Sequence, residues 1–88
     1  MLIKTTKAFE KDLTRMQKRG KDLSKLEYLI KLLANNNVLQ AKYREHKLSG
    51  NYQNLRECHI EPDWLLIYEN QNNILYLART GTHSDLFK

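Results

Sequence analysis

The spacing of apolar side chains changes midway along this chain, and the change decides which elements the sequence can form. In the first half, apolar residues recur at i, i+4 and i+7, as on one face of a helix, until Gly20 provides a natural stop. A second segment with a helical period follows Asp22, which can cap a helix, with Ser24-x-x-Glu27 as an alternative capping box. This segment ends at the turn-forming residues 35–37, so the sequence predicts two antiparallel helices joined by a short loop.

The apolar segments outside this hairpin predict β-strands. Four runs meet this description, at residues 2–5, 52–60, 64–68 and 74–80. The run 64–68 is unbroken, as expected for a central strand covered on both faces, and Pro62 before it suits the second position of a turn. Residues 38–50 are predicted to be a connection without a clear period, and residues 81–87 a short tail. The order β-α-α-β-β-β predicts a single α+β domain over residues 1–88, with the helical hairpin packed on a mostly antiparallel four-stranded sheet.

The composition excludes several classes of protein and favours one kind of partner. The single cysteine, Cys58, excludes an intrachain disulfide and a cysteine-only zinc site, and no apolar run approaches the ~20 residues that span a bilayer. No secretory signal is recognised, so a cytoplasmic protein with no membrane partner is expected. Residues 1–50 carry 12 basic and 5 acidic side chains, whereas residues 51–88 carry 3 and 5. The basic half fits a polyanionic partner, although from charge alone a solvated, lysine-rich helix face is the plainer explanation.

The three histidines lie outside both predicted helices. In a meander of three strands, the turn after the first strand and the end of the third strand lie at the same end of the sheet. The sequence therefore predicts that His59, Asp63, Trp64 and His83 gather there, with His46 joining them if its loop folds over that edge. Each residue also has a plainer explanation: a histidine in a loop is commonly a polar surface group, Asp63 can stabilise its turn, and Trp64 can be core. The histidine spacings match no compact zinc motif, so no metal is predicted.

Taken together, these residues suit the cleavage of RNA without a metal or another cofactor. One imidazole can take the proton from a 2′-hydroxyl while a second group protonates the leaving 5′-oxygen. An arginine, such as Arg56 or Arg79, can stabilise the charge that develops on the phosphate. Aromatic side chains, here Trp64 and Phe87, can stack unpaired bases, which is how proteins commonly hold single-stranded RNA.

The second half of the chain resembles the YafQ-type toxins of the RelE/ParE superfamily, the toxin halves of bacterial toxin–antitoxin pairs. The resemblance rests on three motifs in order: H-x-L-x-G within residues 43–50, H-x-x-P-D within 55–68, and G-T/S-H-x-x-L-F within 79–87. The first half agrees in pattern, as a short strand followed by a helical hairpin. One departure is Lys47, which follows His46 where many relatives have proline, so the loop is expected to be less rigid here.

The resemblance implies a microbial-RNase-like α+β fold and a ribosome-dependent endoribonuclease that cuts mRNA in the decoding site. It also implies a cognate antitoxin that blocks the toxin and supplies the part of the pair that binds operator DNA. The residues that match the family's catalytic set are His46, His59, Asp63 and His83. The residues that match supporting or RNA-binding positions are Trp64, Arg79 and Phe87.

Several alternatives remain open at the level of sequence. A ParE-like toxin that inhibits gyrase would use the same scaffold, although that mode requires no imidazoles, and a relative without activity would only bind its antitoxin. The motifs do not show which imidazole is the base; we expect His46 and His83 to flank the phosphate, with His59 and Asp63 positioning or sharing the proton. The free toxin is expected to be monomeric, with Lys18, Lys21 and Lys25 docking on ribosomal RNA.

Overall fold

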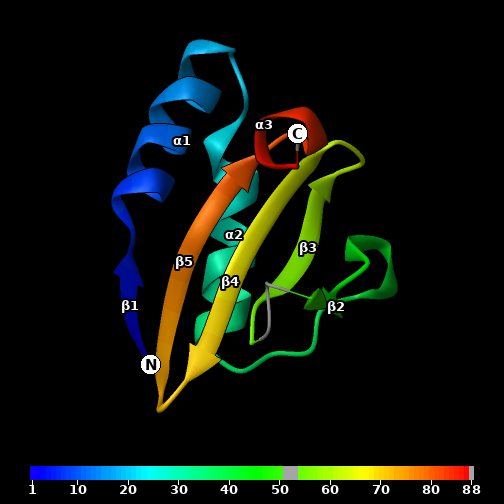
Figure 1. Cartoon of the computed structure of the whole chain (residues 1–88). Helices are drawn as coiled ribbons and strands as arrows, with labels where there is room; N and C mark the ends of the chain where they lie inside the picture. Colours follow the sequence, from blue (N-terminus) through cyan, green and yellow to red (C-terminus); the bar gives the residue numbers. More distant parts are fainter. Residues whose placement is uncertain (51–53, 88) are drawn as a thin grey trace.

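A computed structural model describes residues 1–50 and 54–87, which form one sheet covered by two helices (Figure 1). No helix in these two ranges is long and apolar enough to cross a membrane. The elements in chain order are β1 (Leu2–Thr5), α1 (Lys7–Lys18), α2 (Leu23–Ala34), the 3-10 helix η1 (Ala41–Tyr43), β2 (His46–Lys47), β3 (Arg56–Glu61), β4 (Trp64–Gln71), β5 (Ile74–Gly81) and α3 (His83–Leu86).

The sheet has the strand order β1-β5-β4-β3-β2, with β4 at its centre. β1 runs parallel to β5, and the other three pairs are antiparallel. The predicted α+β class, helical hairpin and mostly antiparallel sheet are therefore confirmed. The apolar run at the start of β4 is buried throughout, as expected of a central strand covered on both faces.

The prediction of four strands was wrong by one. The segment taken as a connection contains η1 and the two-residue strand β2, which pairs with Arg56 and Glu57 at the start of β3. A strand of two residues shows no alternation, so the sequence pattern could not reveal it. The start of the predicted strand 52–60 falls partly outside the described residues; within them, β3 begins at Arg56.

Side-chain caps define where the two long helices begin. The Thr6 hydroxyl accepts a hydrogen bond from the backbone N–H of Phe9, and the Asp22 carboxylate accepts one from the N–H of Ser24. Asp22, and not the alternative box at Ser24, is thus the cap of α2. After α1, Gly20 has a φ of 80°, the left-handed conformation that commonly ends a helix.

The hydrophobic core lies between these helices and the sheet. Helix residues Phe9, Met16, Leu26 and Leu29 pack with the inward-facing residues of the strands, and all four are almost fully buried. Cys58 and Ile60 of β3 belong to the same core. Because successive side chains of a strand point to opposite faces, Glu57 and His59 of β3 alternate with these core residues.

Candidate active site

Three histidines from three separate elements form a row at one end of the sheet. His46 lies on β2, His59 on β3, and His83 begins α3, directly after β5. The ring centroids of His46 and His59 are 6.4 Å apart, and those of His59 and His83 are 5.7 Å apart. The meander explains the approach of His59 and His83, and β2 explains how the more distant His46 joins them.

The loop before β2 is held so that the His46 ring lies beside His59. Arg44 has a φ of 50° and a ψ of 43°, a left-handed conformation uncommon for a residue other than glycine or asparagine. The Arg44 carbonyl accepts a hydrogen bond from Nδ1 of His46 at 2.8 Å. Glu45 is anchored by the hydroxyl of Tyr68 and lies 3.5 Å from Arg56. The loop is therefore tied to β3 and β4 immediately before the histidine.

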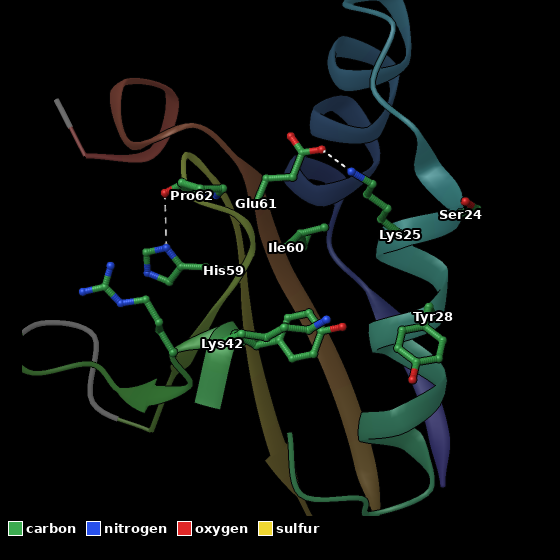
Figure 2. A pocket seen from close by; sticks show the side chains of 10 residues that line it. Ser24, Lys25, Tyr28, Lys42, His59, Ile60, Glu61 and Pro62 are labelled. Carbon is green, nitrogen blue, oxygen red and sulfur yellow. Dashed lines mark hydrogen bonds and ion pairs between the residues drawn. The ribbon is translucent and has the colours of Figure 1, made fainter. Parts of the chain in front are cut away.

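A buried carboxylate that the sequence analysis missed joins two of the histidines. Glu57 Oε1 lies 3.4 Å from Nε2 of His46 and 3.4 Å from Nε2 of His59, and its side chain is 7% exposed. Nδ1 of His59 in turn lies 3.3 Å from the carbonyl of Pro62 (Figure 2). The two-residue period of a strand puts positions 57 and 59 on one face, so alternation was the signal that could have identified Glu57.

The third histidine is paired with Asp63. Oδ1 of Asp63 accepts hydrogen bonds from the His83 backbone N–H at 2.9 Å and from its Nδ1 at 2.6 Å. These bonds, the backbone one first, lower the pKa of Asp63 below its ordinary value, so the carboxyl is ionised at neutral pH. Since a carboxylate only accepts, Nδ1 of His83 carries a proton and Nε2 is left as the atom for proton transfer.

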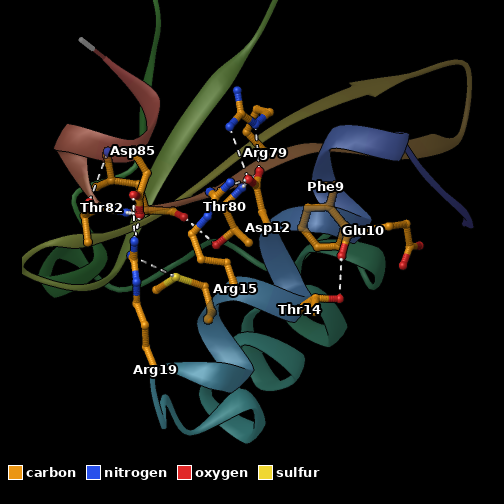
Figure 3. Close-up of polar contacts among 12 residues, drawn as sticks. Phe9, Glu10, Asp12, Thr14, Arg15, Arg19, Arg79, Thr80, Thr82 and Asp85 are labelled. Carbon is orange, nitrogen blue, oxygen red and sulfur yellow. Dashed lines mark hydrogen bonds and ion pairs between the residues drawn. The ribbon is translucent and has the colours of Figure 1, made fainter.

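Helix α3 places His83 through a set of hydrogen bonds at its first turn. The Thr82 hydroxyl and the Asp85 carboxylate each accept from the other's backbone N–H, forming a capping box (Figure 3). Arg19 at the end of α1 donates to both carboxylate oxygens of Asp85, at 2.6 and 3.0 Å. The hydrogen bond from Arg19 is the largest cause of a strongly lowered pKa at Asp85. The Thr82-x-x-Asp85 pattern could have predicted this helix, which we expected to be a tail.

The four supporting residues have different surroundings. The expectation that Trp64 stacks an RNA base was wrong: it is fully buried, and its Nε1 donates to the Thr80 hydroxyl at 2.9 Å. Trp64 is thus a core residue directly after the turn at Pro62 and Asp63, as the alternative explanation of this residue predicted. Phe87 is 37% exposed just after α3, and Arg56 lies beside the loop of His46.

Arg79 is bound to a buried carboxylate of the neighbouring helix. Its Nε donates to Asp12 at 2.7 Å and its Nη2 at 3.1 Å, and the Thr80 backbone N–H donates to the same side chain at 3.1 Å (Figure 3). Asp12 is 1% exposed, so this network fixes α1 against β5. Arg79 therefore has a structural role next to the strand end that leads to His83.

Comparisons with known proteins agree with the fold and with the motifs. The family model for the YafQ bacterial toxin of type II toxin–antitoxin systems matches residues 1–88. An Escherichia coli (strain K12) protein named mRNA interferase toxin YafQ is 48% identical over 80 residues, which cover 90% of this chain and 87% of that protein.

Solved structures extend the similarity to nearly the whole chain. A YafQ chain in a crystal structure of the E. coli DinJ–YafQ complex gives a TM-score of 0.92 at 45% identity, covering 98% of this chain and 97% of that chain. A crystal structure of a metal-bound toxin from Helicobacter pylori gives a TM-score of 0.92 at 44% identity, covering 99% of both chains.

Proposed function

The chain belongs to the YafQ family of bacterial toxins of type II toxin–antitoxin systems, and we propose that it is an endoribonuclease that cuts mRNA in the decoding site of the ribosome. The E. coli relative is named an mRNA interferase toxin. The observation that carries the proposal is the row of three imidazoles, 6.4 and 5.7 Å apart, with carboxylates of Glu57 and Asp63 against them. Imidazoles exchange protons near neutral pH, as a ribonuclease without a metal requires.

In the proposed reaction, the 2′-hydroxyl of the RNA attacks the adjacent phosphorus, and the bond from phosphorus to the 5′-oxygen breaks. One imidazole takes the proton of the 2′-hydroxyl, and another group gives a proton to the 5′-oxygen. We assign these two roles, in either order, to His46 and His83, the ends of the row. The products are a 2′,3′-cyclic phosphate and a 5′-hydroxyl.

The remaining groups orient these two rings. Asp63 holds the Nδ1 proton of His83, so Nε2 is the atom of that ring that exchanges protons. The Arg44 carbonyl holds the Nδ1 proton of His46, and Nε2 of that ring exchanges its proton beside the Glu57 carboxylate. Glu57 faces Nε2 of His46 and Nε2 of His59. It therefore fixes the ring of His46 relative to that of His59. The substrate supplies its own nucleophile, so no covalent intermediate on the protein is needed.

A metal ion has no part in this mechanism. A solved relative from H. pylori is described as metal-bound. In the part of this chain that the structure describes, no group of three or more histidine, cysteine, aspartate or glutamate side chains is arranged to hold a metal ion. The proposed proton transfers use imidazoles and carboxylates alone, and none of them requires a metal ion.

The partners follow from the family and from the charge distribution. A YafQ relative forms a complex with DinJ, and we propose that a cognate antitoxin binds this toxin, blocks it in the cytoplasm and supplies the contact with operator DNA. The basic first half is proposed to dock on ribosomal RNA. Lys21 and Lys25 each lie 2.8 Å from a Glu61 carboxylate oxygen, so they are not the simple surface cations expected, and Lys18 is the cleaner position for testing ribosome binding.

A cleavage assay with purified ribosomes tests this function. We expect the unchanged protein to cut ribosome-bound mRNA in the presence of a chelator, and His83→Ala to abolish cutting. His83 has a side chain 53% exposed, so its removal is expected to leave the melting temperature nearly unchanged. Gln71→Ala, an exposed change at the end of β4 away from the histidines, is the control and retains activity. Undiminished cutting by a triple variant lacking His46, His59 and His83 would refute the proposal, and gyrase inhibition with intact mRNA would favour a ParE-like toxin.

A further inference from the structure

A groove of about 560 Å³ opens beside the row of histidines. It lies between α2, η1 and the part of β3 beyond the residues that pair with β2. Its volume falls within the range of roughly 300–1,000 Å³ that is usual for small-molecule sites. Figure 2 shows Tyr28 and Lys25 on the α2 side of the groove and His59 on the opposite side.

The groove and the candidate active site share residues. His59 lines the groove and is the middle member of the row. Arg44 also lines it, and the carbonyl of the same residue holds Nδ1 of His46 at 2.8 Å. A strand of RNA whose phosphate lies at the histidines therefore meets this groove with a neighbouring nucleotide. Resting on the proposed function, we propose that the groove binds the base and phosphate of an unpaired nucleotide next to the cleavage position.

The charges of the lining fit a phosphate. Lys25, Lys42 and Arg44 line the groove from two elements, against one carboxylate, Glu61. That carboxylate lies 2.8 Å from Nζ of Lys21 and 2.8 Å from Nζ of Lys25, so its charge is already compensated. The excess positive charge lies on η1 and the residue after it, where Lys42 and Arg44 remain for a phosphate.

The aromatic residues fit a base. Tyr28 is 54% exposed on α2, so much of its ring is open to contact with a base. On the other wall, Nζ of Lys42 lies 5.1 Å from the centre of the Tyr43 ring. Aromatic rings beside cations are the usual way to hold single-stranded RNA without reading its sequence.

A protein occupant is the competing explanation, and the lining disfavours it. Lysine is depleted from the cores of protein–protein interfaces, whereas Lys25 and Lys42 both line this groove. The continuity with His59 also favours the substrate over an antitoxin segment. An antitoxin in the groove is therefore treated as the outcome that the experiment must exclude.

The experiment measures binding of a trinucleotide that cannot be cleaved because its 2′-hydroxyls are methylated. We expect the unchanged toxin to bind it, and Tyr28→Ala to weaken the affinity about tenfold or more, since a stacked base is lost. Tyr28→Phe, which keeps the ring, restores the affinity. Lys42→Ala weakens binding and reduces its salt dependence, whereas the matched change Lys11→Ala, at an exposed position of α1 that does not line the groove, does neither.

The outcomes separate this proposal from the function on which it rests. No binding of the trinucleotide to the unchanged toxin, or equal binding by Tyr28→Ala, overturns the groove proposal even where ribosome-bound mRNA is still cut. Reduced affinity of Tyr28→Ala for the antitoxin, with RNA affinity unchanged, identifies the groove as a protein site and also overturns it. If the unchanged toxin binds the trinucleotide in the groove but cuts no mRNA, the subsite proposal is supported and the proposed endoribonuclease activity is refuted.

Discussion

Replacing Asp12 by alanine is expected to destabilise the protein more than its position in the middle of a helix suggests. The side chain is 1% exposed and accepts four hydrogen bonds: two from Arg79, one from the Thr80 backbone N–H and one from Arg15. Its loss leaves a buried N–H without its acceptor, which costs about 1–3 kcal/mol. It also removes one partner of a buried ion pair, which costs about 3–5 kcal/mol when both charges are buried.

The two costs overlap, and exposure reduces the second. The Arg79 side chain is 36% exposed and regains water when its partner is removed, so we expect a total of about 3 kcal/mol. The side chain of Arg15 is 41% exposed and contributes about 0–1 kcal/mol. Since a domain of this size is stabilised by roughly 5–15 kcal/mol in total, the loss is a large fraction of the free energy of unfolding.

Urea unfolding followed by the fluorescence of the buried Trp64 measures this loss. With a slope near 1 kcal/mol per molar urea, the midpoint of Asp12→Ala is expected to fall by about 3 M. Asp12→Asn keeps an acceptor for the Thr80 N–H but loses the charge. Its urea midpoint should therefore lie between those of the unchanged protein and Asp12→Ala. Arg15→Ala serves as the control. A loss below about 1 kcal/mol for Asp12→Ala, or a loss equal to that of Arg15→Ala, would refute the argument.

Three further predictions concern other parts of the structure. In Gly81→Ala, the new Cβ would lie 3.0 Å from Cβ and Oδ2 of Asp85 at a φ of 157°, so the capping box of α3 should be disturbed and cutting should fall about tenfold or more, as measured by cleavage of ribosome-bound mRNA. Burial raises the pKa of the Cys58 thiol to about 12, so a thiol reagent at pH 8 should react only as fast as the protein unfolds; rapid labelling of the folded protein would contradict this. Because the pKa of Asp85 is lowered in the folded state, its contribution to stability is complete above about pH 5 and is lost as the pH falls below the unfolded value of about 4. In Arg19→Ala, acid unfolding between pH 5 and 2 should therefore be shallower than in the unchanged protein, and an identical pH profile would exclude this pair as the cause.

The sequence predicted the elements whose patterns are long enough to repeat. The helical period of α1 and α2, the cap at Asp22 and the apolar run of β4 each extend over several residues or carry a specific capping group, and each was confirmed. β2 was missed because two residues carry no period. α3 was missed although Thr82 and Asp85 form its capping box, since a helix of four residues shows no apolar face.

The candidate site was predicted in part for a similar reason. The meander brought His59, Asp63 and His83 to one end of the sheet, and this follows from strand order alone. The approach of His46 depends on the left-handed backbone of Arg44 and on the contacts of Glu45. No local sequence pattern predicts either feature. Trp64 was misjudged as a stacking residue although the unbroken apolar run 64–68 already predicted a strand covered on both faces, which buries it.

The chemistry of the cut RNA ends tests the central claim most directly. The toxin is incubated with ribosomes carrying a defined mRNA, with a chelator present, and both new termini are identified. Proton transfer by the histidine row predicts a 2′,3′-cyclic phosphate on one fragment and a 5′-hydroxyl on the other, with both products absent for His83→Ala. A 5′-phosphate, or cutting that stops when the chelator is added, would contradict the mechanism proposed here.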